Sequence, residues 1–404
     1  MMYGVLGIIT AFAVLGILIS KKVEFGLALI SATIILLLFT NFSFEALEWV
    51  YEILMEYDTI NLVAIILLIG LIGFIYRDSG QINRIIKELQ SAFPDRRMVI
   101  ASIPAIFGLM PMPGGALVSA PMIDKEGDRL GMDGVHKAYV NWWFRHIWFT
   151  IYPLGLGLII AATITGVNLY MIALFNVPIF VTHLIIGINF GLRDIEVDKV
   201  KSDGPANLIL LIYDFLPIII ALSLNIILPV PLALTLLLAV LMLIYQNRKK
   251  YGLSETANML KNGLSKNLLL AGIGIMLFKG TIERSGALIP VIDLLEGRIP
   301  LIAVVILGSF AMGFSIGHLP AGVGITFPVL IPLLPIVNTQ TVAMVFIFIL
   351  IGYIISPIHL CIILTLEYYK ANMNGFYKKA APSMMVLVGS IFLWLFLTGT
   401  LSLF

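Results

Sequence analysis

Long apolar segments follow one another along almost the whole of this 404-residue chain, with few charges between them. Hydrophobic residues make up 60% of the sequence and charged residues only 12%, a balance outside the range of soluble globular proteins. The first segment, Tyr3 to Ser20, leads directly into further apolar segments, so we expect a transmembrane helix there and not a signal peptide. The sequence therefore predicts an all-α polytopic membrane protein.

Ten segments have the roughly 17 to 25 apolar residues that an α-helix needs to cross a bilayer. They cover residues 3–20, 24–41, 60–76, 138–162, 167–190, 206–228, 230–246, 266–282, 342–366 and 381–403.

Two further apolar stretches, residues 98–123 and 300–334, contain proline and glycine near their middle. An uninterrupted arm such as Met98 to Met110 reaches only about 20 Å, whereas the hydrocarbon core of a bilayer is about 30 Å thick. We therefore predict that each stretch is a re-entrant helical hairpin that returns to its own side of the membrane.

The distribution of lysine and arginine agrees with this count of crossings, because basic residues concentrate in cytoplasmic loops. With the N-terminus outside, ten crossings and two hairpins place 21 of the 25 Lys and Arg residues in cytoplasmic loops. The segment from Phe44 to Asp58, with five acidic residues and no basic one, falls outside. The pattern predicts a multi-pass membrane protein with both termini outside.

The two halves of the chain resemble each other. "PMPGGALVSAP" (Pro111 to Pro121) aligns with "HLPAGVGITFP" (His318 to Pro328), and "RDSG" and "YPLG" align with "ERSG" and "SPIH" at nearly the same offset. We predict two inverted repeats, each with five transmembrane helices plus one re-entrant helical hairpin and one broken helix. The first repeat is residues 1–205, with scaffold helices 1–76, hairpin 98–123 and broken helix 138–162; the second is residues 206–404, with scaffold helices 206–282, hairpin 300–334 and broken helix 342–366.

Because each half crosses the membrane an odd number of times, the second half has the opposite orientation in the membrane. Inverted repeats with interrupted helices at matching positions are typical of secondary transporters, whose binding site lies near the midplane between the repeats. Non-helical backbone at that depth is tolerated only where it is buried in protein or lines an aqueous cavity. The second arms begin just after Gly115 and Gly322, so their free amide groups suit an anion. Ser119 and Thr326 add hydroxyl groups one turn later, and the free carbonyls of the first arms suit a sodium ion.

Charged and titratable side chains accompany these breaks. Arg145 precedes the break at Pro153 and is a candidate to neutralise an anionic substrate, although it could instead extend to the cytoplasmic interface. His318 and His359 lie near the same predicted site and could bind a carboxylate or take part in proton coupling, with hydrogen-bonded packing histidines as the alternative. Asp214 and Lys279 lie within scaffold spans and could form a structural pair.

The motifs "PMPGGALVSAPM", "RHIW" and "SPIHLCIILTLEYY" resemble an uncharacterised family of archaeal and bacterial membrane proteins, domain of unknown function 401, over essentially the whole chain. That family is grouped with the ion transporter superfamily of divalent anion/sodium symporters and gluconate or citrate carriers. The resemblance implies a homodimer in a prokaryotic plasma membrane, with elevator-type movement. It places substrate at the two hairpin tips and the two unwound segments, which correspond here to Pro113 to Ser119, Tyr152 to Gly155, Pro320 to Thr326 and Ser356 to His359. The predicted substrate-binding residues within these segments are Pro113, Gly114, Gly115, Ser119, Pro320, Gly322, Thr326, Ser356 and His359, and the charge and position of Arg145 and His318 add these two.

By the same resemblance, a sodium ion is expected near Gly115, Ser119, Tyr152, Gly322, Thr326 and Ser356. The dicarboxylate carriers have Ser-Asn-Thr at both tips, where this chain has Met112 to Gly115 and Leu319 to Gly322. The departure leaves open the substrate and the choice between sodium and protons as coupling ion.

The leading hypothesis is therefore a cation-coupled (Na⁺ or H⁺) symporter of a small organic anion such as a carboxylate. A cation/proton antiporter, a channel and a membrane-embedded enzyme are the alternatives. No paired acidic motif favours an antiporter, and no HExxH motif or Asp dyad favours an enzyme. The single cysteine, Cys361, excludes an internal disulfide and a cysteine metal cluster, and a net charge of +2 does not indicate a nucleic-acid partner. No cofactor is expected besides Na⁺ as coupling ion.

Overall fold

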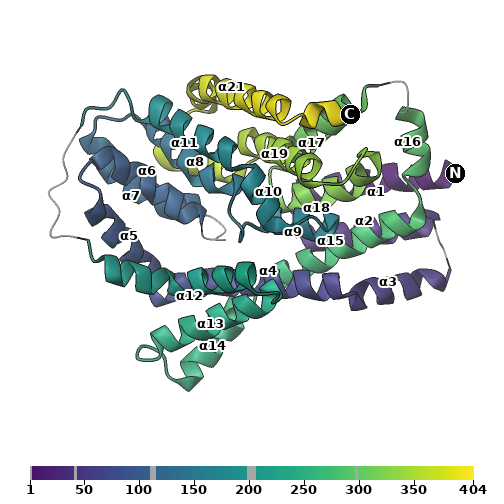
Figure 1. Ribbon diagram of the computed structural model, residues 1–404, viewed down its shortest axis with the longest axis horizontal. Coiled ribbons are helices and arrows are strands. Elements are labelled where there is room, and N and C mark those ends of the chain that lie inside the picture. The colour runs from purple at the N-terminus through teal and green to yellow at the C-terminus, as the bar shows by residue number, and fades with distance from the viewer. Residues whose placement is uncertain (1, 41–42, 110–114, 198–205, 296–298) are drawn as a thin grey trace.

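The computed structural model describes residues 2–40, 43–109, 115–197, 206–295 and 299–404 of the chain. Every regular element within these residues is a helix, which confirms the predicted all-helical class. Figure 1 shows the helices side by side in an elongated molecule, with α21 along one edge and α13 and α14 at the opposite edge.

The helices follow one another in this order. The N-terminal part contains α1 (Met2–Ser20), α2 (Phe25–Thr40), α3 (Glu45–Met55), α4 (Tyr57–Ser79), α5 (Gln81–Ala92), α6 (Arg96–Gly108), α7 (Gly115–Arg129), α8 (Gly134–His146), η1 (Ile147–Thr150), α9 (Leu156–Thr165), α10 (Leu169–Phe175) and α11 (Val177–Gly191). The C-terminal part contains α12 (Leu208–Ile227), α13 (Leu232–Asn247), α14 (Leu253–Gly263), α15 (Lys266–Ser285), α16 (Ile289–Leu295), α17 (Leu301–Ile316), α18 (Leu319–Leu330), η2 (Ile331–Leu333), α19 (Thr339–Ile355), α20 (Leu360–Tyr369), α21 (Met373–Leu397) and η3 (Thr400–Leu403).

Four helical segments are long and apolar enough to cross a membrane, and a fifth is added if a bent pair counts as one span. The four are α4, α12, α21 and the combined segment Thr339–Tyr369, which correspond to four of the ten predicted spans. Helices α1, α2, α11 and α13, with 19, 16, 15 and 16 residues, match other predicted spans in whole or in part, and α15 has 20 residues with charged side chains near its end. These helices are compatible with a membrane protein, while the full count of ten crossings stays a prediction.

Two predicted spans differ from the helices observed. The segment 138–162 is divided into α8, η1 and α9, so its interruption is longer than the single break expected at Pro153. The segment 167–190 is divided at Asn176 into α10 and α11. Helices α9 and α10 meet at an angle of 119°. Pro153, which has no amide hydrogen to donate, lies in the first interruption. At the bend, Gly166 ends α9 in the left-handed conformation and the side chain of Asn168 caps α10.

The ends of the helices follow from local chemistry. The side-chain oxygens of Asp133, Asn338 and Asn372 accept hydrogen bonds from amides in the first turns of α8, α19 and α21. At the other end, Gly80 terminates α4 and Gly286 terminates α15, each with φ near +60 to +80°. Glycine adopts this left-handed conformation without steric cost, so both helices stop one residue before it.

Small residues allow some helices to approach closely. A Cβ at Gly26 of α2 would lie 2.2 Å from the carbonyl carbon of Leu270 in α15. A Cβ at Gly313 of α17 would lie 2.0 Å from the carbonyl oxygen of Ile349 in α19. Close packing of this kind is the main source of attraction between helices in lipid, where burial of apolar surface contributes little.

The broken and interrupted elements gather in the interior. Helices α6 and α7 pack together and both contact α8; α17 and α18 pack together and both contact α19. Helix α7 also contacts α20, and α18 contacts α9. The segment after α8 and the segment after α19 are thereby brought to the region that forms the candidate site.

Candidate functional site

The segment after α8 is the first of two non-helical stretches at this site. Helix α8 ends at His146 and is followed by the short 3₁₀ helix η1, and a turn from Tyr152 to Gly155 then leads into α9. The amide of Gly155 donates to the carbonyl of Tyr152 at 2.8 Å. The Tyr152 side chain is half-buried.

The segment after α19 is the second non-helical stretch. Helix α19 ends at Ile355, and Ser356 to His359 form a turn before α20. Ser356 is buried, and its hydroxyl donates to the carbonyl oxygen of Phe314 in α17. This hydrogen bond connects the turn to α17, the first arm of the second predicted hairpin. The hydroxyl hydrogen of Ser356 is therefore not available to a ligand in this arrangement.

Arg145 is the charged residue of the site. Its side chain is only 4% exposed, and its Nε and Nη1 atoms have no hydrogen-bond partner among the residues that the structure describes. The guanidinium lies against Gly115, the first residue of α7, because a Cβ there would be 2.5 Å from Nη2. A buried cation without a counter-ion is costly, so the surroundings of Arg145 favour binding of an anion. The burial also argues against the alternative in which this arginine extends to the cytoplasmic interface.

Ser119 is buried one turn into α7 and takes part in a hydrogen-bond network. Its hydroxyl donates to Oδ1 of Asn141 at 2.7 Å, and Nδ2 of Asn141 donates to Oγ1 of Thr365 in α20 at 3.2 Å. The network joins α7, α8 and α20. Ser119 thus stabilises the packing of these helices, and because its hydrogen is donated to Asn141, its oxygen can act toward a ligand only as an acceptor.

The corresponding residues of the second half differ from those of the first. Thr326 is 1% exposed, and its Oγ1 has no partner among the described residues, so it remains free to contact a ligand. A Cβ at Gly322 would meet Ile349 of α19 at 3.1 Å, which places this glycine at a helix contact. Pro320 is half-buried near the start of α18. Pro113 and Gly114 lie outside the described residues.

Of the three histidines near the site, two are buried and one is exposed. His359 is 1% exposed at the N-terminal end of α20, and His146 is fully buried at the end of α8. Their ring centroids are 4.8 Å apart, and the ring of Tyr353 lies 4.1 Å from that of His359. His318 is exposed at the turn between α17 and α18, with its ring 6.1 Å from that of Phe25.

Two residues of this region were not among the predicted site residues. His146 follows Arg145 directly, and Cys361 lies two positions after His359, so both could have been found from their spacing to residues already selected. In the sequence, a lone cysteine bears only on disulfides and cysteine clusters. Its proximity to a histidine from a distant helix depends on the packing of α8 against α20.

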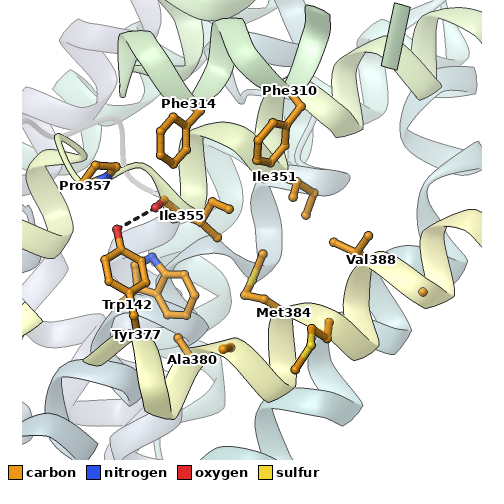
Figure 2. Close-up of a pocket in the computed structure, with 13 residues that line it drawn as sticks. Trp142, Phe310, Phe314, Ile351, Ile355, Pro357, Tyr377, Ala380, Met384 and Val388 are labelled. Atoms are coloured by element: carbon orange, nitrogen blue, oxygen red, sulfur yellow. Dashed lines mark hydrogen bonds between the residues drawn. The ribbon is translucent and has the colours of Figure 1, made fainter. Parts of the chain in front are cut away.

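A separate apolar cavity of about 730 Å³ lies between α17, α19 and α21. Figure 2 shows the Tyr377 hydroxyl at its edge, donating to the carbonyl oxygen of Ile355 at 2.7 Å. None of the described residues that line this cavity is charged, so it does not suit an anion. Its lining consists of Trp142, Phe310, Phe314, Ile351, Ile355, Pro357, Tyr377, Ala380, Ala381, Met384, Met385, Val388 and Gly389.

Comparison with known proteins gives one match. The family described as "Protein of unknown function (DUF401)" matches residues 3–398 of the chain. No curated protein matches it.

Proposed function

We propose that this chain, which belongs to the DUF401 family of proteins of unknown function, is a secondary active transporter. In this proposal it is a cation-coupled (Na⁺ or H⁺) symporter of a small organic anion such as a carboxylate. The proposal includes a homodimer in a prokaryotic plasma membrane and elevator-type movement, as in the ion transporter superfamily that the motifs resemble.

The observation that carries the proposal is the buried guanidinium of Arg145 beside the first residue of α7. Two of its nitrogens lack partners among the described residues, and the amide groups at the start of a helix also favour negative charge. A carboxylate can accept two parallel hydrogen bonds from one guanidinium. An anion at this position would therefore remove an electrostatic penalty that the protein otherwise carries.

The predicted inverted repeat is supported by features that recur in the two halves. Gly80 and Gly286 end helices α4 and α15 in the same left-handed conformation, 206 residues apart. Asn168 and Asn372, 204 residues apart, cap the helices that follow the α9 and α20 segments. Correspondence in fold as well as in sequence favours a duplicated architecture of the kind found in secondary transporters.

Helix contacts support the same architecture. A Cβ added at Gly108 would lie 2.1 Å from the carbonyl oxygen of Arg145, and a Cβ added at Gly313 would lie 2.0 Å from that of Ile349. The two glycines therefore make equivalent close contacts in the two halves. Helix α7 contacts α20 of the other half, and α18 contacts α9. Each predicted hairpin therefore packs against the half-helix that follows the break of the opposite repeat, so that both breaks border one site.

An antiporter is the second transport hypothesis. It needs a buried carboxylate that exchanges a proton for a cation, and Asp214 is a fully buried acidic residue of the described chain. Its carboxylate accepts hydrogen bonds from Arg84 and Gln81, so it is already neutralised. This pairing favours the symporter over the antiporter.

Ligand-dependent thermal stability tests the proposal. The detergent-purified protein is heated with a panel of small carboxylates, in sodium or potassium buffer and at several pH values. A ligand at 100 times its dissociation constant stabilises by about 2.7 kcal/mol, which is readily measured. We expect one carboxylate to raise the melting temperature, and Arg145→Gln to abolish that shift.

Arg248→Gln is the matched control, because this exposed arginine stacks on Tyr245 away from the site. Uptake of the stabilising carboxylate into proteoliposomes under a sodium or proton gradient then identifies the coupling ion. Absence of any carboxylate effect on well-folded protein would contradict the proposal. Flux that does not saturate with substrate would favour a channel instead.

A further inference from the structure

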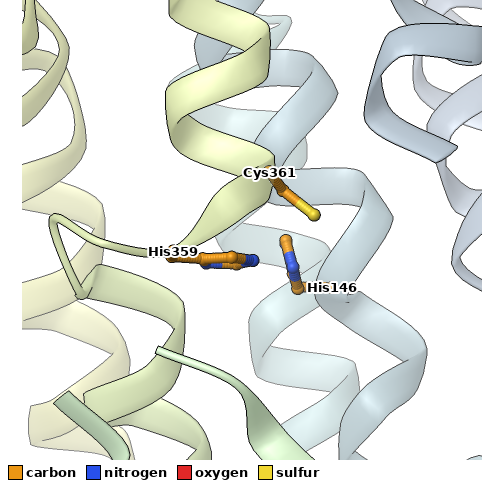
Figure 3. A group of neighbouring side chains, drawn as sticks. All are labelled: His146, His359 and Cys361. Carbon is orange, nitrogen blue, oxygen red and sulfur yellow. The ribbon is translucent and has the colours of Figure 1, made fainter. Parts of the chain in front are cut away.

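Two histidines and the cysteine form a compact cluster where the two non-helical segments meet. His146 is the last residue of α8, His359 precedes α20, and Cys361 is the second residue of α20. One ligand atom from each residue lies within 4.8 Å of the other two. Figure 3 shows the three side chains directed toward one another from the two neighbouring segments.

Hydrogen bonds fix which imidazole nitrogens are free. Nδ1 of His146 lies 2.6 Å from the carbonyl oxygen of Trp142, and Nδ1 of His359 lies 3.3 Å from that of Ile354. A carbonyl only accepts, so each Nδ1 carries the proton and each Nε2 presents a lone pair. Both Nε2 atoms are buried and make no hydrogen bond of normal geometry to the described residues, and the thiol of Cys361 is the polar group that interacts with them.

This arrangement has the form of a metal-binding site. Metal-ligating histidines usually donate the hydrogen of their other nitrogen to a carbonyl or carboxylate, as both histidines do here. Packing histidines, by contrast, normally satisfy both nitrogens when buried. Two buried imidazole Nε2 atoms and a thiol therefore provide three suitable ligand atoms for one cation.

We propose that His146, His359 and Cys361 bind a zinc-class divalent cation through Nε2, Nε2 and Sγ. Two imidazoles and one thiolate are ligands that Zn²⁺ prefers, and three protein ligands leave a fourth position open. Tetrahedral Zn²⁺ would bring the ligand atoms to about 3.5 Å from one another, so the cluster needs to contract only slightly.

The charges around the cluster favour an anion as a further ligand of the bound ion. A thiolate offsets one of the two positive charges, and Arg145 is the residue next to His146 in the chain. The resulting net positive charge favours an anion at the fourth position. Cys361 is only half-buried, so the ion can approach from its side, while both histidines are buried.

The ligands come from the two halves of the chain. His146 belongs to the segment before the first break, and His359 and Cys361 belong to the segment after the second. A bound ion would therefore cross-link α8 to α20 and stabilise the contact between the two broken elements. This inference does not depend on the substrate or on transport.

Cobalt binding to the full-length protein in detergent tests the site, because Co²⁺ occupies zinc sites and gives a charge-transfer band when a thiolate binds it. Cys361 is the sole cysteine, so any such band reports this residue. We expect one Co²⁺ per chain, displacement by Zn²⁺, and a rise in melting temperature with Zn²⁺. His146→Gln and His359→Gln should each weaken binding about 100-fold or more, since even an outer-shell partner is worth about 10- to 100-fold.

His136→Gln is the matched control, because His136 lies in the first turn of α8 with its Nε2 bonded to the carbonyl oxygen of Gly191. It should leave the band and the affinity unchanged. Cys361→Ser removes the thiolate with little change in volume and should remove the band in protein that remains folded. A folded wild type without a band, or a band that both histidine variants retain at full affinity, overturns the proposal. Binding of Cu⁺ without binding of Zn²⁺ overturns the assignment to a divalent ion.

Discussion

The guanidinium of Arg145 and the α-carbon of Gly115 are in contact: a Cβ at Gly115 would lie 2.5 Å from Nη2 and 2.7 Å from Nη1 of the arginine. A side chain larger than that of glycine would clash with the guanidinium in its present position. The contact joins the end of α8 to the start of α7, and it fixes where an anion would meet both the guanidinium and the helix.

Gly115→Ala should therefore weaken anion binding. The added methyl group pushes the guanidinium away from the start of α7, because the far end of a side chain moves more easily than backbone. We expect affinity for the stabilising carboxylate to fall about tenfold, which corresponds to about 1.4 kcal/mol. Calorimetric or thermal-shift titration measures it. Gly16→Ala is the control, since nothing lies within 4 Å of a Cβ there, and unchanged affinity in Gly115→Ala would contradict the role of this contact.

Gly313→Ala should destabilise the protein severely. The new Cβ would lie 2.0 Å from the carbonyl oxygen of Ile349, and backbone cannot move aside as a side chain can. Overpacking typically costs about 1 to 3 kcal/mol, and we expect a loss at the upper end of this range. Gly308→Ala on the same helix is the control, because its nearest neighbour is a Leu330 methyl group at 3.9 Å. Equal melting temperatures of the two variants would argue against the close contact of α17 and α19.

Asp214→Asn should destabilise the contact between α5 and α12. The carboxylate is fully buried, and Nε of Arg84 donates to it at 2.7 Å. The Arg84 side chain is 40% exposed, so water screens part of the lost interaction, and we expect a cost of about 1 to 3 kcal/mol. Asp78→Asn, at an exposed hydrogen bond to Tyr251, should cost less. Thermal unfolding at constant pH measures both, and an equal loss in the two variants would contradict a special role of Asp214.

Local patterns were sufficient to predict much of the helical framework. The apolar segments and the glycines near 80 and 286 mark helices and helix ends that the structure contains. These features depend on hydrophobicity and on backbone conformation, which neighbouring residues largely determine. The division of segments 138–162 and 167–190 was harder to predict, because it depends on where side chains and neighbouring helices satisfy the freed backbone groups.

Partners distant in sequence could not be predicted. The sequence offers Asp214 and Lys279 as a possible pair, but the structure pairs Asp214 with Arg84 and Lys279 with Glu283. The burial of Arg145 beside Gly115 and the meeting of His146 with Cys361 likewise depend on how helices cross. Charge and residue type indicate that such groups need partners. Only the packing of the helices determines which partners they find.

The stability of the protein should fall as the pH decreases below about 6.5, and His136 should account for part of the loss. Burial lowers the pKa of His136, which lies half-buried with Nε2 at 2.7 Å from the carbonyl oxygen of Gly191. A histidine whose pKa is lower in the folded state is protonated more readily after unfolding, so stability is complete above the unfolded pKa of 6.5. It is lost progressively as the pH falls toward the folded pKa. His136→Gln removes this titration, and the melting temperature of the variant should depend less on pH below 6.5. Parallel pH profiles of wild type and variant would show that another group is responsible.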